Sequence, residues 1–271
     1  MASVDRAKIA GRLKCTLIKC YAPRPLLHLL MVLDSHFRVE VIAATPNPQQ
    51  CIYAAMHQDY AETFVADEQL PDETVCGHTI VRKLLAGERG HYGPLEHPQI
   101  TLNIGWFPHS VMQQARTHRV GVSFDVQSMR YTGKRVCQAA EGAIALEDVF
   151  YLRPVGVYKD RQGKQYDYTQ LQRGIDLRMC RHAAERYRDL LERGYAEEHA
   201  RGILPFDYRQ HFVVSFSLRA FLHFMDLRAK LDAQEEIRAL CELMWPHLQT
   251  WAPEIAAWYE KHRLHKARLA P

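Results

Sequence analysis

The sequence has no hydrophobic run long enough to cross a membrane. Its apolar run near the N-terminus, Leu26 to Leu33, is interrupted by His28. This run begins too late for a secretion signal and is too short to span a bilayer. We therefore expect a cytoplasmic protein with no membrane partner.

The cysteines lack the number and spacing of a disulfide framework or a metal site. The seven cysteines form an odd set with no C-x-x-C pair and no histidine at zinc-finger spacing. This pattern argues for reduced thiols and against a disulfide framework or a structural metal. We expect most of these cysteines to be small core residues. No cysteine has a convincing nucleophile setting, which disfavours chemistry through a cysteine nucleophile.

Internal repeats, low-complexity tracts and long Gly/Ser linkers are also missing, so nothing suggests a domain boundary within the core. The 271 residues are 47% hydrophobic and 10% aromatic, enough for one folded domain. Charge is nearly balanced, with 35 basic and 31 acidic residues and a formal net charge of +4. This balance favours phosphate-bearing partners only mildly and does not separate nucleotides from nucleic acids.

Periodicity of apolar residues predicts both strands and helices. Segment 169–193 places Leu171, Ile175, Met179, Ala183, Tyr187 and Leu190 on one helical face, whereas segment 207–227 is apolar nearly all round and predicts a buried helix. The expected strands are 14–20, 37–43, 99–105 and 149–153, with a hairpin at 158–166 that turns at Gly163. Further helices are expected at 49–60, 75–86 and 108–117, and around Ile237, Leu240, Cys241, Met244 and Leu248.

Polar side chains are concentrated in residues 113–131. Arg116, Arg119 and Arg130 are interleaved there with amides, a carboxylate and a hydroxyl. Guanidinium groups match phosphate oxygens with two hydrogen bonds, and a solvated basic face would not need the interleaved groups. Aromatic residues that could stack on single-stranded bases are few, which weakens the interpretation as a nucleic-acid groove. An anionic ligand rich in hydrogen-bonding groups is the better expectation.

The loop from Gly90 to His97 contains two imidazoles, His91 and His97, near a carboxylate, Glu96. Pro94 breaks any helix that would align the histidines, and no H-E-x-x-H motif is present, so we predict no metal site. Two alternatives remain open: a ligand-binding loop, or a turn in which His91 and Glu96 cap neighbouring backbone.

Two isolated arginines, Arg201 and Arg228, stand beside strongly apolar sequence. Each could form a structural ion pair, with Asp207 or Asp226 as the partner. Alternatively, each could face an anion that develops during a reaction, where a low dielectric strengthens the attraction. The residues alone leave these two roles about equally supported.

Taken together, the motifs resemble the flavin-dependent thymidylate synthase (ThyX) family over roughly residues 37–250. They occur in the family's order: G-H-x-x-P-x-E-H (Gly90 to His97), H-R (His118, Arg119), S-x-R-Y (Ser128 to Tyr131), R-x-x-L-P (Arg201 to Pro205) and L-R-x-x-x-x-A-Q (Leu227 to Gln234). The resemblance implies an α+β fold, in which a mixed or antiparallel sheet packs with long helices in a single-domain subunit of a homotetramer. Residues 1–36 are then an N-terminal extension, and residues 37–271 form the synthase-like domain.

The resemblance also implies the reaction, which is methylation of dUMP to dTMP. FAD is the cofactor, 5,10-methylenetetrahydrofolate the carbon donor and NADPH the reductant. Arg228 would lie against the uracil as the catalytic residue, favouring ionisation at N3 and so activating C5. The implied flavin-binding residues are His91, Gly93, Thr117, His118, Arg119, Asp125, Ser217, Arg219 and His223. The implied dUMP-binding residues are Gln114, Arg116, Asp125, Ser128, Met129, Arg130, Arg201 and Arg228, with Arg201 on the phosphate.

The chain departs from the family's pattern in one region. The usual R-H-R begins here with Thr117, and one extra residue separates His118 from Ser128. Arg116 is the neighbouring cation, but on a helix it points about 100° away from position 117. Two alternatives therefore stay open: an enzyme on the same scaffold that modifies another pyrimidine nucleotide, and a nucleic-acid-binding protein whose affinity falls steeply with salt.

Overall fold

The computed structural model describes residues 34–87, 90–160 and 162–266. The strand expected at 14–20 and nearly all of the expected extension lie outside these residues. A boundary at residue 36 therefore remains a prediction. Within the described residues, no helix has the length and apolar character needed to cross a membrane.

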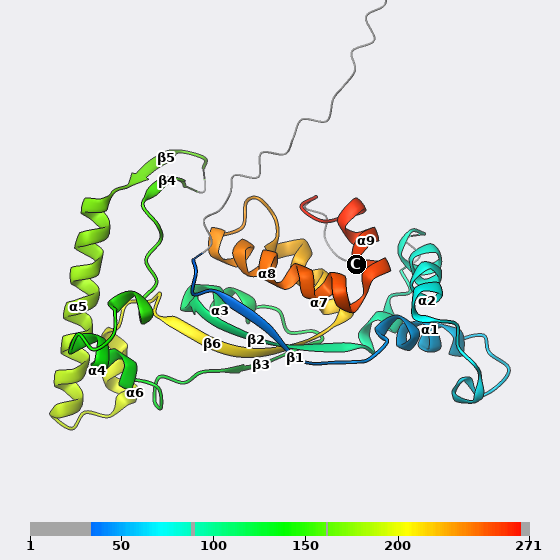
Figure 1. The fold of residues 1–271 in the computed structure, drawn as a ribbon, viewed down its shortest axis with the longest axis horizontal. Helices are drawn as coiled ribbons and strands as arrows, with labels where there is room; N and C mark the ends of the chain where they lie inside the picture. The colour runs from blue at the N-terminus through cyan, green and yellow to red at the C-terminus, as the bar shows by residue number, and fades with distance from the viewer. Residues whose placement is uncertain (1–33, 88–89, 161, 267–271) are drawn as a thin grey trace, which may run out of the picture. The chain divides into compact units, whose positions relative to one another are not determined.

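A four-stranded antiparallel sheet lies at the centre of the fold (Figure 1), in the order β1 (Arg38–Ala44), β2 (Gln99–Pro108), β6 (Arg209–Ser217), β3 (Val122–Val126). The alternation predicted for β2 is confirmed, because Ile100, Leu102 and Ile104 are all buried. The position of β1 is confirmed as well. The edge strand β3 was not predicted. It is short, and only its pairing with β6 identifies it.

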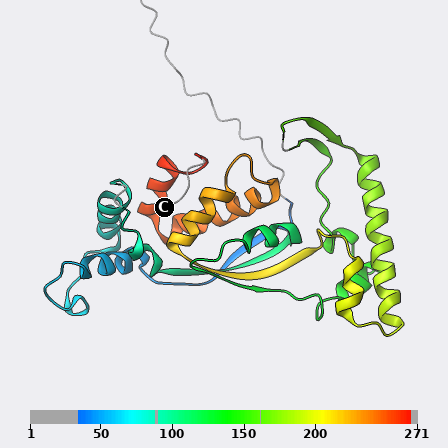
Figure 2. The same ribbon diagram turned by 180° about the vertical axis from the view of Figure 1, so that it is seen from behind.

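Helices cover one face of this sheet in both views (Figures 1 and 2). They are α3 (His109–Ala115), α7 (Leu218–Arg228) and α8 (Glu235–Trp251), and α9 (Pro253–His262) packs against α8. The predicted apolar face of α8 is confirmed, since Ile237, Leu240 and Met244 are fully buried. On the N-terminal side, α1 (Pro48–Gln58) packs against α2 (Glu73–Ile80), which continues as a π-helical segment, Val81–Leu85.

A second hydrophobic cluster forms around α5 (Gln170–Glu192). The helices α4 (Lys134–Ala140) and α6 (Glu197–Ala200) contact α5, and the predicted hairpin is present as β4 (Gly156–Lys159) and β5 (Gln165–Tyr168). Gly163 has a positive φ of 85° in its turn, as the hairpin requires. Met129, Tyr187 and Ala200 are members of this cluster, so it joins the segments that follow β3 and precede β6.

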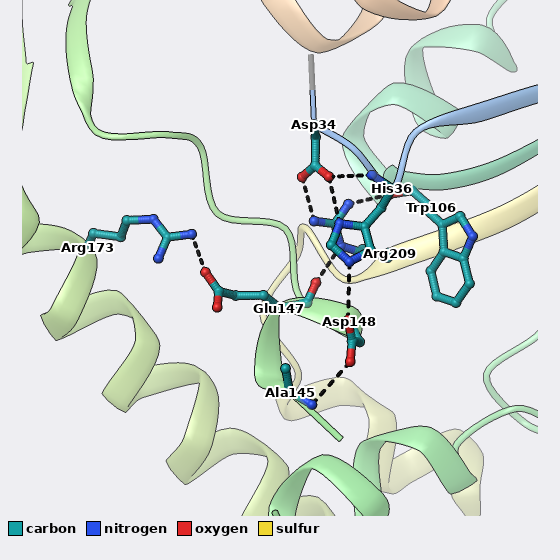
Figure 3. Close-up of polar contacts among 8 residues, drawn as sticks. All are labelled: Asp34, His36, Trp106, Ala145, Glu147, Asp148, Arg173 and Arg209. Carbon is teal, nitrogen blue, oxygen red and sulfur yellow. Dashed lines mark hydrogen bonds and ion pairs between the residues drawn. The ribbon is translucent and has the colours of Figure 1, made fainter. Parts of the chain in front are cut away.

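The buried side chain of Arg209 connects this cluster to the sheet (Figure 3). Its guanidinium donates to the carbonyl oxygens of Glu147 at 2.6 Å and Trp106 at 2.8 Å, and to Asp34 Oδ2 at 2.5 Å. Trp106 lies in a β-bulge with φ of 70°, a strained backbone conformation for a bulky residue. The hydrogen bond from Arg209 offsets part of that strain by satisfying the displaced carbonyl.

Asp34 is held in place by Arg209 and His36. The His36 ring lies 2.8 Å from Asp34 Oδ1 through Nδ1 and 3.2 Å from Asp148 Oδ1 through Nε2 (Figure 3). Burial raises the pKa of the Asp34 carboxyl, but hydrogen bonds from Arg209 and His36 outweigh it, so the pKa falls below its usual value. The carboxylate therefore stays ionised as the partner of a buried cation.

Two predicted elements are wrong. Segment 149–153 is not a strand, because Phe150 forms only an isolated bridge with Tyr208, and Pro154, which has no N–H, soon follows. Segment 207–227 is not one helix: β6 occupies its first half and α7 its second. In β6 the buried residues Phe212, Val214 and Phe216 alternate with half-buried ones. Val213 between them is apolar as well, and the apolar helix α7 follows directly, so periodicity did not separate the strand from the helix.

The predicted apolar face of α5 is also only partly right. The buried residues are Cys180, Ala184, Tyr187 and Leu190, toward the C-terminal half of the helix. In the N-terminal half, Leu171, Ile175 and Met179 are 72%, 42% and 63% exposed. These three residues, spaced four apart, form an apolar stripe that the described part of the chain leaves open to solvent.

Candidate functional site

Arg228, the last residue of α7, is held by the turn that follows α3. Its Nε donates to His118 Nε2 at 3.0 Å, and its Nη2 donates to the Gln114 carbonyl at 3.1 Å and to Thr117 Oγ1 at 2.7 Å. All three acceptors are uncharged when His118 is neutral. Asp226, one of the two carboxylates considered as a structural partner, instead binds Tyr259 at 2.7 Å and Arg263 at 2.9 Å. No carboxylate neutralises the guanidinium among these contacts. Its positive charge is therefore available to an anionic ligand.

His118 is the acceptor for Arg228 only in its neutral form. Its side chain is buried, and it packs edge-on against His223 with ring centroids 5.4 Å apart. Burial, then the charge of Arg228, then His223 lower the pKa of His118 from 6.5 to about 4. Because Nε2 accepts a hydrogen bond, the ring proton belongs on Nδ1 at neutral pH.

This lowered pKa predicts an acid sensitivity of folding. Between the unfolded pKa of 6.5 and the folded value of about 4, the unfolded chain binds a proton at His118 that the folded chain does not bind. The free energy of unfolding should therefore fall by roughly 2 kcal/mol through this residue between about pH 7 and about pH 5. Urea unfolding of the wild type and His118→Gln at both pH values measures it. The variant should lose less stability on acidification, and equal losses would contradict the assignment.

The turn that carries His118 is locked onto the start of α7. The carbonyl of Gly121 accepts a hydrogen bond from the Ser217 backbone N–H at 2.9 Å. Gly121 has φ of 67°, and a Cβ there would lie 2.5 Å from Ser217 Oγ and 3.1 Å from Ala220 Cβ. Only glycine satisfies both the conformation and the packing. The distance between the turn and α7 is thereby fixed.

A groove of about 570 Å³ opens beside this turn. Arg116, His118 and Arg119 line it together with β3 residues Val122, Phe124 and Val126. Arginines suit a phosphate group, and the apolar strand face suits a flat ring system. The structure thus brings Arg116, His118 and Arg119 to one groove, as expected for the cluster at 113–131.

The loop at Gly90–His97 faces α7. Glu96 forms an ion pair with Arg219 at 2.6 Å, and His91 Nε2 lies 2.8 Å from Asp59 Oδ2. Both side chains therefore pair with other side chains and do not act as the backbone caps that were one alternative. The open space around Gly93 leaves its backbone accessible. Within the described residues, no group of histidine, cysteine and acidic side chains is arranged to hold a metal ion.

Ser128, Arg130 and Arg201 belong to a different part of the molecule, next to the cluster around α5. Arg130 Nε pairs with Glu198 at 2.9 Å, and Glu198 lies in α6, three residues before Arg201. Arg201 is exposed and follows α6 directly. No hydrogen bond or ion pair between described residues connects this group with Arg228.

The structure also shows the burial or the contacts of three further predicted site residues, Met129, Ser217 and Asp125. Met129 is 2% exposed in the cluster around α5, so only its backbone is available to a ligand. Ser217 caps α7, its Oγ accepting from the Ala220 N–H at 3.2 Å. Asp125 is exposed on the edge strand β3.

The resemblance did not include among the implied site residues two residues that the structure places beside them. Gln234 accepts a hydrogen bond from the Gln114 side chain and donates to Glu236 at 2.7 Å, and Glu96 pairs with Arg219. Both residues belong to motifs quoted above, and this membership was the available signal. Gln114 and Arg219, the partners that bring them to the site, lie more than 100 positions away along the chain, so periodicity could not reveal these contacts.

The described cysteines do not offer a nucleophile. Cys76, Cys180 and Cys241 are buried, and burial raises the pKa of Cys76 and Cys180 to about 11. It also raises the pKa of Cys241, whose thiol is fully enclosed. Thiols with such pKa values are protonated and unreactive at neutral pH. The expectation of small core cysteines is confirmed for these three residues.

Comparison with known proteins agrees with this arrangement. Residues 40–254 match the family described as Thymidylate synthase complementing protein. The flavin-dependent thymidylate synthase of Halobacterium salinarum is 34% identical over 86% of this chain and 100% of its own, and that of Haloarcula marismortui is 30% identical over 86% and 99%. In fold, a UMP/dUMP methylase, PolB from Streptomyces cacaoi bound with 5-Br dUMP, aligns with a TM-score of 0.69 and 22% identity, covering 87% of this chain and 97% of that one. The chain therefore belongs to the flavin-dependent thymidylate synthase family.

Proposed function

We propose that this protein methylates dUMP to dTMP, with FAD as cofactor, 5,10-methylenetetrahydrofolate as carbon donor and NADPH as reductant. The observation that carries this proposal is the placement of Arg228. A cation held by two neutral side chains and a backbone carbonyl, beside a groove with two more arginines, is suited to an anionic substrate. Membership of the family supplies the reaction class.

The groove beside His118 fits a flavin nucleotide. Arg116 and Arg119 would bind its phosphates, and Val122 and Phe124 would contact its apolar parts. When bound, the flavin would supply the hydride needed to reduce the transferred carbon to a methyl group. His118 also contacts the ring of His223 on α7, and Arg219 on the same helix pairs with Glu96, so both are available as further flavin contacts.

Arg228 would act on the uracil. A fixed guanidinium beside N3 and its neighbouring carbonyl lowers the cost of negative charge on the ring, and that charge raises electron density at C5. No enzyme nucleophile is needed for this activation, in agreement with the high pKa values of the described buried cysteines. The Gln114 side chain, tied to Gln234, would orient the substrate from the same turn.

The phosphate of dUMP would be bound by the second group of residues, Ser128, Arg130 and Arg201. Because no described contact joins this group with Arg228, we propose that a complete site forms between subunits of a homotetramer. The exposed apolar stripe of α5, Leu171, Ile175 and Met179, supports association, since burying it against another copy would stabilise the assembly.

A second candidate is methylation of another pyrimidine nucleotide on the same scaffold. The observation that favours it is Thr117, which replaces an arginine beside the uracil-activating Arg228 and so changes the groups near the substrate. The solved neighbour from Streptomyces cacaoi is described as acting on both UMP and dUMP. Substrate choice is therefore part of the test.

The experiment is a product assay on the purified protein. Its absorbance spectrum should show bound flavin, and incubation with dUMP, methylenetetrahydrofolate and NADPH should yield dTMP. Parallel reactions with UMP and dCMP distinguish the second candidate by their methylated products. A colourless protein that binds DNA in a strongly salt-dependent manner would overturn both proposals and favour the nucleic-acid alternative.

A further inference from the structure

The hydroxyl of Thr117 connects the turn after α3 with the end of α7. Its Oγ1 donates to the Gln114 carbonyl at 2.7 Å and accepts from Arg228 Nη2 at 2.7 Å. The same Nη2 donates to the Gln114 carbonyl at 3.1 Å. Thr117, Gln114 and the Nη2 group thus form a closed triangle of hydrogen bonds, while Nε is fixed separately by His118 at 3.0 Å.

We propose that Thr117 is a positioning residue, whose hydroxyl sets the direction in which the Arg228 guanidinium faces the substrate. This inference rests on the proposed function, because it gives Thr117 a role only through Arg228. With Nε and Nη2 both held by the protein, Nη1 makes no hydrogen bond with another described residue and remains for the ligand. The plane of the guanidinium is set by contacts on two of its three nitrogens.

A hydroxyl is well suited to this position. It can donate and accept at once, which the geometry at Gln114 and Arg228 requires. A carboxylate at this position would neutralise the cation. Serine keeps the hydroxyl, whereas valine keeps the shape of threonine and removes it. The Thr117 side chain is exposed, so these substitutions leave the core intact.

Loss of the Thr117 hydroxyl should also change the pKa of His118. Its ring faces Arg228 and His223, and the charge of Arg228 is the second-largest cause of its low pKa, after burial. If the guanidinium loses the Thr117 contact and moves, that charge acts from a greater distance and the pKa of His118 rises. A threonine with a merely local structural role would not change the titration of a neighbouring imidazole in this way.

The experiment compares Thr117→Val with Thr117→Ser in the full-length protein. For Thr117→Val we expect kcat to fall roughly ten- to hundredfold with a smaller change in the KM for dUMP, because misorientation costs most in the transition state. For Thr117→Ser we expect kcat within about threefold of the wild type, since the hydroxyl is kept. Independently of activity, NMR of histidine ring carbons should show a raised pKa for His118 in Thr117→Val only, with the signal assigned by its loss in His118→Gln.

The outcomes separate this inference from the proposed function. If Arg228→Ala abolishes turnover but Thr117→Val leaves both kcat and the His118 pKa unchanged, Thr117 does not position Arg228, and the inference fails alone. Equal losses in the serine and valine variants would also overturn it, since the hydroxyl would then not be the active feature. If Arg228→Ala retains full turnover, the proposed role of Arg228 in the reaction is wrong, and the inference about Thr117 is overturned with it.

Discussion

Replacing Arg228 with alanine should reduce turnover of dUMP at least about a thousandfold while the purified protein stays yellow. The side chain ends α7 and is held by His118, Thr117 and the Gln114 carbonyl, with no carboxylate among these partners. Its removal takes away the charge that stabilises the ionised uracil. The groove at Arg116 and Arg119, where the flavin is proposed to bind, remains. Steady-state kinetics and the flavin absorbance of the same sample measure both effects.

Arg238→Ala is the matched control for this experiment. Arg238 is also a partly buried helical arginine, but it pairs with Glu235 at 3.8 Å within α8. Its removal should leave kcat within about twofold of the wild type, as for a surface ion pair. The assignment of Arg228 to the nucleotide would be wrong if Arg228→Ala lost its flavin and regained turnover when FAD was added.

Replacing Arg209 with alanine should cost about 3–5 kcal/mol of unfolding free energy. The side chain is 2% exposed, and its loss leaves Asp34 with His36 as its remaining partner and leaves the carbonyls of Glu147 and Trp106 without this donor (Figure 3). A buried carboxylate that has lost its cation and two carbonyls that have lost their donor are together costly. Urea unfolding followed by circular dichroism gives the change.

A surface pair provides the comparison for Arg209. Arg38 binds Glu40 at 3.0 Å, but the two side chains are 70% and 56% exposed. Arg38→Ala should change stability by no more than about 0.5 kcal/mol, because water solvates both charges well. Similar losses in the two variants would mean that the contacts of Arg209 contribute no more than a solvated pair does.

The sequence predicted best the elements whose apolar pattern has one buried face. The face of α8 and the alternation in β2 follow directly from burial on one side. Prediction failed where an apolar strand runs directly into an apolar helix, and where an apolar face has no partner in the described chain. β6 is a central strand and looked like a buried helix, and the N-terminal half of α5 has an apolar face with nothing against it in the described chain. In both cases the structure of the segment depends on contacts with residues outside it, which its own sequence pattern does not contain.

The same distinction applies to the candidate site. Motif order and residue chemistry identified Arg228, His118 and Gln114, and the structure brings these three together. The bond from Thr117 to Arg228 was not foreseen, because it joins residues 111 positions apart. Asp226, two residues before Arg228, was one possible partner, but it binds Tyr259 of α9 and Arg263 instead. Proximity along a helix does not show which way each side chain points.

The close contact at Gly121 has a consequence for how this site can change during evolution. Any side chain at Gly121 would collide with Ser217 and Ala220, so substitutions there should destabilise the fold. Four residues earlier, Thr117 is exposed and free of such packing. The turn therefore combines a position whose substitution would destabilise the fold with one whose substitution would act on the orientation of Arg228, so activity can change at the second without loss of the fold.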